Sequence, residues 1–172
     1  MMHTDVAATH SIANCQIAVV IPAFKASSSI VSVLDGIPDF VSLIVVVDDA
    51  SPDDVASKVR NKADKDSRLR LVQHPVNMGV GGAVLTGYRT AFEAGMKIFV
   101  KMDSDGQMDP RYLPILIRPL LTGQADYAKG NRFLHQVELT RMPLARRIGN
   151  LGLSFFTKLA SGYWNIFDPT NG

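Results

Sequence analysis

Four short runs of apolar, largely β-branched residues recur along the chain, and they limit the folds that it can adopt. The runs cover residues 17–22, 43–49, 69–73 and 97–103, and each ends in a turn-forming or acidic residue or is followed by one. Runs that are this short and apolar are typical of strands buried on both faces of a parallel sheet. The chain therefore predicts a sheet whose strands are joined by longer crossover segments.

Segments of helical length lie between these runs. Residues 27–29 predict the start of a helix that continues through Leu34, and Ser51 with Asp54 resembles a capping box in which Asp replaces Glu. The longest predicted helix covers residues 79–94. Its apolar positions are Val80, Val84, Tyr88, Ala91 and Phe92. Because strand and helix alternate, we predict an α/β fold with a mostly parallel central sheet.

Acidic residues gather where the second and fourth runs end, at Asp48, Asp49, Asp103 and Asp105. The carboxyl ends of parallel strands meet at one edge of a sheet, where such folds bind ligands, so we expect these four carboxylates to face one crevice. Neighbouring carboxylates repel unless a cation or water separates them. Oxygen ligands without His or Cys favour Mg²⁺ or Mn²⁺. The alternative is an acidic turn, since Asp and Gly commonly end strands.

The glycine-rich stretch GVGGAV, residues 79–84, matches neither common phosphate-binding motif. Val84 stands where a dinucleotide fingerprint needs Gly or Ala, and no GK[ST] follows any glycine loop. We expect a turn that leads into a helix, with Gly79 and Gly82 allowing a ligand close to the backbone amides. A glycine-rich turn without a ligand is the alternative.

The size of the chain suits one globular domain. It has 172 residues, of which 47% are hydrophobic, and this is enough for a single core. The single Cys15 excludes an internal disulfide and a thiolate zinc cluster. Residues 1–16 lack the basic start and apolar run of a secretory signal, so we predict a disordered leader there. The domain is then expected over residues 17–172.

The last quarter of the chain is basic. From Lys129 onward, six Lys or Arg stand against two acids, which favours an anionic partner or, alternatively, an ordinary solvated face. Residues 148–167 have apolar side chains at helical spacing, but the centre of this segment is too polar to span a membrane. We expect it either to pack in the core or to lie at a membrane interface. The mixed charges do not favour a nucleic-acid partner.

Six motifs stand in the order seen in one enzyme family. They are VVIPAFKASSSI, IVVVDDASPDD, NMGVGGAVLTGYRTA, FVKMDSDGQMDP, AKGNRF and DPTNG. With these motifs, the chain resembles the inverting GT-A-type glycosyltransferases of family 2, and more narrowly their dolichol-phosphate mannose synthase and polyprenyl-phosphate glycosyltransferase branch. The resemblance covers residues 17–172 and implies a Rossmann-like three-layer fold. It also implies transfer of a sugar from a UDP- or GDP-sugar to an acceptor, expected to be a polyprenyl phosphate at the cytoplasmic face of the membrane.

The resemblance further implies roles for individual residues at the donor site. Asp49, with Asp48 beside it, would contact the base or ribose of the nucleotide, and Pro22 and Ala23 would line the same pocket. Asp103 and Asp105 would be the DxD pair that holds Mg²⁺ or Mn²⁺ on the diphosphate, with Ser104 between them. Gln107, two residues further on, would reach the same metal.

The residues expected to act in catalysis are spread more widely. Asp105 would act with the metal, and Arg132 and Arg147 would meet the phosphate of the acceptor or the departing diphosphate. Such positive groups stabilise the charge that develops on the leaving group. A hydroxyl acceptor would need a general base, whereas a phosphate acceptor arrives already ionised. Asp168 in DPTNG is a candidate base or positioning group, and a loop Asp before Pro is the alternative.

Two other functions fit part of the pattern. A phosphatase of the haloacid dehalogenase type also ends a strand in DxD, with the first Asp as nucleophile. It expects Thr or Val where Gln107 stands, and it leaves Asp48 and Asp49 without a role. The second alternative is a nucleotide-sugar binding fragment without catalysis, because family members usually continue past the position of Gly172. The sequence does not identify the nucleotide, the sugar, the lipid or the oligomeric state.

Overall fold

The computed structural model describes residues 15–130. The chain divides into two compact units, Met1–Gln124 and Ala125–Gly172, and the secondary structure described below belongs to the first. The basic last quarter, the predicted segment 148–167 and most of the predicted leader lie outside the described residues. At the end of the predicted leader, the carbonyl of Gln16 accepts backbone hydrogen bonds from Lys97 and Ile98.

The elements follow the predicted alternation of strand and helix. In chain order they are β1 (Ile17–Ala23), α2 (Ile30–Asp35), β2 (Leu43–Asp48), α3 (Val55–Ala63), β3 (Leu69–Gln73), α4 (Gly79–Glu93), β4 (Ile98–Lys101), the 3-10 helix η1 (Pro110–Tyr112) and α5 (Leu113–Leu121). All four predicted strands are confirmed, although β4 ends two residues earlier than expected. Helix α5 was not predicted, and its stretch LPILIRPLL contains two prolines.

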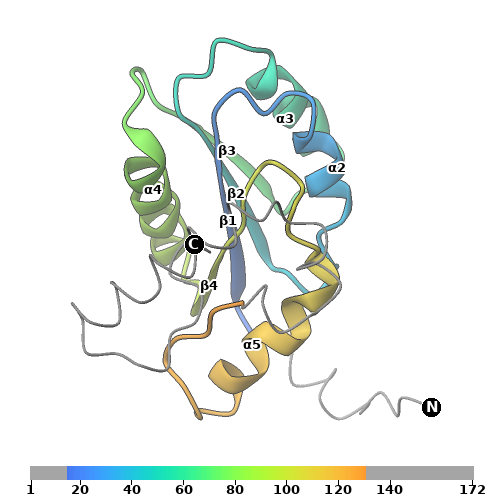
Figure 1. Cartoon of the computed structure of the whole chain (residues 1–172), viewed down its shortest axis with the longest axis vertical. Coiled ribbons are helices and arrows are strands. Elements are labelled where there is room, and N and C mark those ends of the chain that lie inside the picture. Colours follow the sequence, from blue (N-terminus) through green and yellow to red (C-terminus); the bar gives the residue numbers. More distant parts are fainter. Residues whose placement is uncertain (1–14, 131–172) are drawn as a thin grey trace, which may run out of the picture. The chain divides into compact units, whose positions relative to one another are not determined.

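The four strands form one parallel sheet in the order β3-β2-β1-β4. Ala23 of β1 pairs with Asp48 of β2, and Val20 of β1 pairs with Lys101 of β4. This arrangement confirms the predicted parallel sheet. All four strands therefore point their carboxyl ends toward the same edge, which is the upper edge in Figure 1.

Two hydrophobic clusters, one on each face of the sheet, make three layers. Ile17, Val19 and Ile21 of β1 join the cluster that contains residues of α2, α3 and α5. Ala18 and Val20, which point the other way, join the cluster that contains residues of α4. Figure 1 shows α4 on one side of the sheet and α2 and α3 on the other. Burial on both faces explains why β1, and β2 up to Asp48, are apolar rather than alternating.

Only some of the apolar positions predicted for α4 face the sheet, among them Ala91 and the partly buried Tyr88. The buried positions of α4 are Ala83, Gly87 and Ala91, whereas Val80 and Phe92 are exposed. The backbone of α4 lies so close to the sheet that a Cβ atom on Gly87 would stand 2.2 Å from Cγ1 of Val20. Small residues therefore occupy the inner face of α4, and the helix places some of its larger apolar side chains in solvent.

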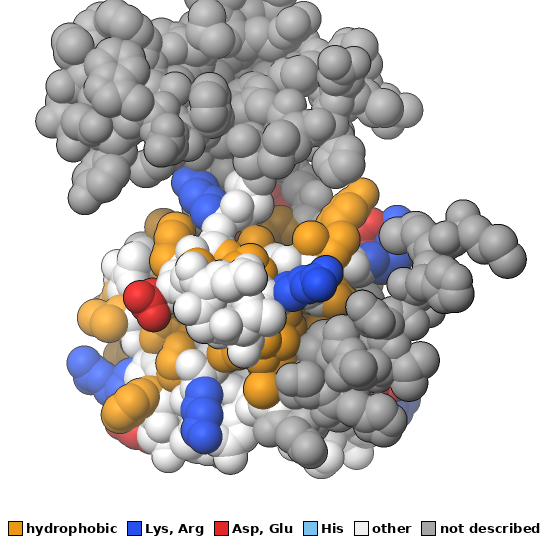
Figure 2. Space-filling model, turned by 90° about the horizontal axis from the view of Figure 1, so that it is seen from below, with side chains coloured by type: hydrophobic (Ala, Val, Ile, Leu, Met, Phe, Trp, Pro, Cys, Tyr) orange, Lys and Arg blue, Asp and Glu red, His pale blue; other side chains and the backbone are white. Residues whose placement is uncertain are grey.

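Helix α5 is short and strongly apolar, and it is only partly covered by the described residues. It buries Leu113 and Ile117 but leaves Ile115 67% exposed. Figure 2 shows apolar side chains lying between Lys and Arg side chains on the face seen from below. In residues 15–130, no helix is long and apolar enough to cross a membrane.

Candidate functional site

The predicted acidic residues of β2 and β4 lie at the same edge of the sheet. Asp48 is the last residue of β2, and Asp103 follows the end of β4 by two residues. The end of β1 at Ala23 lies between them, since β1 pairs with both strands. Neighbouring strands are about 4.8 Å apart, so the ends of β2 and β4 are separated by roughly 10 Å. This separation suits a ligand that touches both.

Asp49 is buried and held by several hydrogen bonds. Its Oδ1 lies 2.7 Å from Nδ1 of His74 and accepts a bond of 2.8 Å from the backbone N–H of Met78. Burial alone would raise the pKa of Asp49, but the bonds from Met78, His74 and Gly79 outweigh it and lower the pKa. The carboxylate is therefore kept ionised, and it ties the end of β2 to the first turn of α4.

His74 was not predicted, although it directly follows β3 at the same edge of the sheet. Its side chain is only 7% exposed, and its Nε2 lies 2.9 Å from Oγ1 of Thr86 in α4. Because an ionised carboxylate only accepts hydrogen bonds, Nδ1 of His74 carries the proton toward Asp49. The signal that was missed is the position of this residue, immediately after a parallel strand. His74 joins β2, β3 and α4 through side-chain contacts.

Both carboxylate oxygens of Asp48 accept hydrogen bonds from within the protein. One carboxylate oxygen accepts a bond of 2.9 Å from the backbone N–H of Ser51, and the other accepts a bond of 3.0 Å from Nε2 of Gln73. The residue is 3% exposed. These contacts give Asp48 a role in shaping the loop after β2, and its contact with a nucleotide stays a prediction.

Asp53, an acidic residue that was not predicted as a site residue, joins the loops after β1 and β2. Its carboxylate accepts hydrogen bonds from the backbone N–H of Ser27 and from the hydroxyl of Ser51. The same hydroxyl accepts a bond of 2.7 Å from the backbone N–H of Lys25. Ser51 is thus engaged with Asp53, and α3 begins at Val55 without a side-chain cap, so the predicted capping box is wrong.

The two loops also hold backbone strain. Lys25 has φ 55° and Ala50 has φ 54°, and both are non-glycine residues in the left-handed region. Such conformations persist only where surrounding contacts hold them, and they are common in binding loops. The bonds made by Ser51 and Asp53 provide that support at the carboxyl edge of the sheet.

Replacing Asp53 by asparagine is expected to make stability at acidic pH less dependent on pH. Burial raises the pKa of Asp53, but its hydrogen bonds lower it from 3.8 to about 2. A lowered pKa means that the carboxylate stabilises the fold above pH 4 and loses this contribution as the pH falls toward 2. Asp53→Asn should therefore lower the unfolding free energy by about 1–2 kcal/mol at pH 7.

Urea unfolding of both proteins between pH 7 and pH 2 measures this difference. The difference in unfolding free energy between wild type and Asp53→Asn should shrink as the pH falls from 4 toward 2. Asp54→Asn is the matched control, because Asp54 is an exposed neighbour that forms an ion pair with Lys58 at the surface. A gap that stays constant over the whole pH range would contradict the assignment.

The predicted metal pair lies in one turn after β4. Oδ1 of Asp103 lies 2.7 Å from Nζ of Lys101, and Oδ1 of Asp105 accepts a bond of 2.9 Å from the backbone N–H of Gln107. The hydroxyl of Ser29 donates to the carbonyl of Ser104 at 2.6 Å, which fixes the turn to the start of α2. Within residues 15–130, no three His, Cys, Asp or Glu residues are grouped so as to hold a metal. A cation here would need ligands from a bound substrate as well.

Asp109, the third acid of the stretch VKMDSDGQMDP, has a separate role. Its carboxylate forms a two-pronged ion pair with Arg111 and accepts a bond of 2.9 Å from the backbone N–H of Arg111 at the start of η1. The guanidinium of Arg111 lowers the pKa of Asp109. This acid therefore caps η1, and Asp103 and Asp105 remain as the predicted metal pair at the edge.

The glycines at the start of α4 differ in what they contribute. Gly79 has φ +76°, which favours glycine, and a Cβ atom on Gly79 or Gly81 would meet nothing within 4 Å. A Cβ on Gly82 would stand 2.7 Å from Cβ of Met78. The space beside Gly79 and Gly81 is compatible with close approach of a ligand, and the predicted contact of Gly79 and Gly82 with a ligand stays a prediction.

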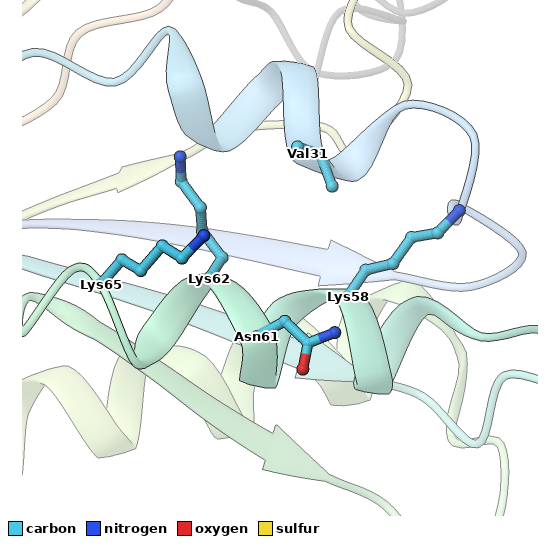
Figure 3. Close-up of a pocket in the computed structure, with 5 residues that line it drawn as sticks. All are labelled: Val31, Lys58, Asn61, Lys62 and Lys65. Carbon is cyan, nitrogen blue, oxygen red and sulfur yellow. The ribbon is translucent and has the colours of Figure 1, made fainter.

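A hollow of about 300 Å³ lies elsewhere, between α2 and α3, where Val31, Lys58, Asn61, Lys62 and Lys65 line it. Figure 3 shows Val31 on α2 and Lys58, Asn61 and Lys62 on α3, and Lys65 follows the end of α3. Nζ of Lys58 donates to the carbonyl of Ser27, and Lys62 pairs with Asp35. Two of the three lysine ammonium groups that line the hollow are thus bonded within the protein. The hollow does not include the acidic residues at the carboxyl edge of the sheet.

The predicted site residues Arg132, Arg147 and Asp168 lie outside the described residues.

Comparisons with known proteins give one family. Residues 18–172 match the family model described as glycosyl transferase family 2. The chain is 32% identical over 166 residues to the UDP-N-acetylglucosamine–dolichyl-phosphate N-acetylglucosaminyltransferase of Methanococcus voltae, covering 89% of this chain and 66% of that one. It is 30% identical over 155 residues to the undecaprenyl-phosphate mannosyltransferase of Micrococcus luteus, covering 89% and 63%. The chain thus spans a little under two-thirds of the length of these relatives.

A comparison of structures agrees. A crystal structure of glucosyl-3-phosphoglycerate synthase from Mycobacterium tuberculosis, in complex with Mn²⁺, UDP-glucose and phosphoglyceric acid, superposes with a TM-score of 0.52 and 30% sequence identity. The match covers 72% of this chain and 45% of that one. The predicted GT-A-type α/β fold is therefore confirmed for the part of the chain that aligns.

Proposed function

The chain belongs to glycosyl transferase family 2, and we propose that it moves a sugar from a nucleotide-diphosphate sugar to a polyprenyl phosphate with inversion. The observation that carries this proposal is the position of Asp49, Asp103 and Asp105 at one edge of a parallel sheet, about two strand spacings apart. The acceptor is proposed because the relatives from Methanococcus voltae and Micrococcus luteus are named for dolichyl phosphate and undecaprenyl phosphate.

The nucleotide is proposed to bind at the end of β2. Asp49 is ionised and only 3% exposed, and the bonds from His74 and Met78 hold it in place. Its remaining acceptor positions are proposed to meet an N–H or hydroxyl group of a base or ribose. Ala23, at the end of β1, lies between this residue and β4 in the sheet, and Pro22 precedes it. A UDP- or GDP-sugar bound over β1 would then extend from Asp49 toward Asp103.

The diphosphate is proposed to bind through a divalent cation, Mg²⁺ or Mn²⁺, held by Asp103 and Asp105 with Gln107. Carboxylate and amide oxygens suit such cations, and the side chains of Asp105 and Gln107 are exposed. When bound, the cation supplies positive charge next to the leaving diphosphate. The bond between Ser29 and the carbonyl of Ser104 holds the turn that presents both carboxylates.

In the proposed reaction, an oxygen of the acceptor phosphate attacks the anomeric carbon as the bond from that carbon to the diphosphate breaks. The electron pair of the broken bond leaves with the nucleoside diphosphate, and the configuration at the carbon inverts. No proton has to be removed, because the acceptor is already ionised. Arg132 and Arg147 are proposed to stabilise the charged acceptor or leaving group, and Asp168 is kept as a positioning group.

A lipid acceptor places the enzyme at a membrane surface. We propose that it works at the cytoplasmic face, where the basic last quarter of the chain would favour anionic lipid phosphates. Residues 17–172 are proposed to form the catalytic domain.

A transfer assay tests the proposed function. The purified chain is incubated with Mn²⁺, a panel of UDP- and GDP-sugars labelled in the sugar, and vesicles that contain a polyprenyl phosphate. We expect label in the lipid fraction with one nucleotide series, and calorimetry should show that Mn²⁺ strengthens binding of the same nucleotide. Binding without transfer would support the fragment that only binds donors. An aspartyl-phosphate trapped on Asp103, or no binding at all, would reject the proposal.

A further inference from the structure

Lys101 places a positive charge directly on the proposed metal pair. It is the last residue of β4, and its Nζ lies 2.7 Å from Oδ1 of Asp103. Its side chain is 19% exposed and that of Asp103 is 37% exposed, so the pair lies at the boundary between the sheet and solvent. In this structure, one member of the carboxylate pair is already neutralised by a side chain.

The strand geometry places Lys101 beside Asp103. Residues two apart in an extended segment point to the same side, and Val100 and Met102 are buried in the cluster that contains residues of α2 and α5. Lys101 and Asp103 therefore point to the opposite side, where Phe99 packs on Tyr88 of α4 with ring centroids 5.9 Å apart. Met102 donates its backbone N–H to Val20 at 2.9 Å, which ties the segment between the two charged residues to β1.

This ammonium has opposite effects on the two parts of the proposed ligand. A divalent cation that shares the Asp103 carboxylate comes within about 5 Å of Nζ and is repelled by it. A diphosphate at the same place is attracted by it. The two carboxylates of Asp103 and Asp105 carry two negative charges, and the ammonium group of Lys101 reduces the net charge of the three residues to one negative charge. The site is then a weaker trap for a free cation and a better site for a phosphate group.

We propose that Lys101 is a specificity residue that directs the carboxylate pair away from free divalent cations and toward the cation–nucleotide complex. This inference rests on the proposed function, because it takes Asp103 and Asp105 as cation ligands. It concerns a different residue and a different property, namely the relative affinity for the cation alone, the nucleotide alone and both together.

Removal of the charge tests the proposal in the full 172-residue chain. Lys101→Met should bind Mn²⁺ alone about tenfold more tightly than wild type, because the repulsion between two cations in a watery environment is lost. It should bind UDP or GDP alone more weakly, by several-fold, because the attraction to phosphate is lost as well. When Mn²⁺ and the nucleotide are both present, the two changes oppose each other. The affinity for the cation–nucleotide complex should therefore change less than the affinity for Mn²⁺ alone or for the nucleotide alone. Free Mn²⁺ is measured by electron paramagnetic resonance and nucleotide binding by calorimetry.

Two further variants make the result specific. Lys101→Arg keeps the charge and should keep both affinities within about twofold of wild type. Lys97→Met removes the same charge from an exposed residue just before β4, at the opposite edge of the sheet, and should leave Mn²⁺ binding unchanged. If Lys101→Met does not fold, as judged by circular dichroism, Lys101→Gln takes its place in the same titrations, and Lys101→Arg still has to match wild type.

The outcomes separate this inference from the proposed function. If Mn²⁺ binds wild type but not Asp103→Asn, and Lys101→Met binds Mn²⁺ no more tightly than wild type, the role of Lys101 is rejected while the metal pair stands. Equal tightening in Lys97→Met would also reject it, since the effect would then come from net charge. If neither Asp103→Asn nor Asp105→Asn changes Mn²⁺ binding, the proposed metal site itself is wrong.

Discussion

Replacing Gly87 by alanine should destabilise the protein by about 3 kcal/mol or more, which is among the largest effects expected of a single methyl group. The added Cβ would stand 2.2 Å from Cγ1 of Val20 and 3.3 Å from Cγ2 of Val47. Both valines are completely buried in the sheet, so α4 has to move outward to make room. Because α4 begins at Met78 and Gly79, next to Asp49, this movement should also weaken nucleotide binding. Thermal and urea unfolding of the variant measure the loss.

Gly81→Ala is the matched control, because it adds the same methyl group to the same helix. A Cβ atom on Gly81 would meet nothing within 4 Å. Alanine is a better helix former than glycine, so this variant should be unchanged or more stable by up to about 1 kcal/mol. Equal stability of Gly87→Ala and wild type would show that α4 does not pack on β1 and β2 as closely as described.

The second large effect is expected in the reaction itself. Asp103→Asn and Asp105→Asn should each lower sugar transfer at least about 100-fold, because the proposed cation on the leaving diphosphate loses a charged ligand. The same variants should lose the strengthening of nucleotide-sugar binding by Mn²⁺. Transfer to lipid in the vesicle assay and calorimetry with and without Mn²⁺ measure the two losses independently.

Asp109→Asn controls for the removal of an acid from the same stretch. Asp109 is paired with Arg111 at the start of η1 and does not belong to the proposed metal pair. Its replacement should leave Mn²⁺-dependent binding within about twofold of wild type, since an exposed ion pair contributes little to stability. A loss in Asp109→Asn as deep as that in Asp103→Asn would contradict the assignment of the pair.

The strands and their common edge were predictable because their signals are local. An apolar run such as residues 43–49 is long enough for a strand and too short for most helices, and the acids that end it mark where the chain leaves the core. Because parallel strands end at one edge of the sheet, the sequence was enough to predict that Asp49 and Asp103 lie at the same edge. The longest helix, residues 79–94, was found in the same way, within one residue of α4.

Other features depend on contacts between residues that are far apart in the chain. His74 and Asp49 are 25 residues apart, as are Gln73 and Asp48, and no pattern within β2 or β3 shows that they touch. Asp53 reads as one of several acids in DDASPDD, but only the structure shows that it bonds Ser27 in the preceding loop. The apolar positions predicted for α4 include the buried Ala91, but they do not include Ala83 and Gly87, which the short distance between helix and sheet places on its inner face.

Sequence alone therefore determined the class of fold, the order of its strands and helices along the chain and the edge that carries the acidic pair, because periodicity and strand ends are properties of neighbouring residues. Tertiary structure alone decided which acids are engaged by the protein itself and which face solvent. Asp48, Asp49 and Asp53 are held by partners from other loops and strands, while Asp105 stays exposed and Asp103 is shared with Lys101. The physical reason is that hydrogen bonding and burial depend on distances in space, which residue order does not contain.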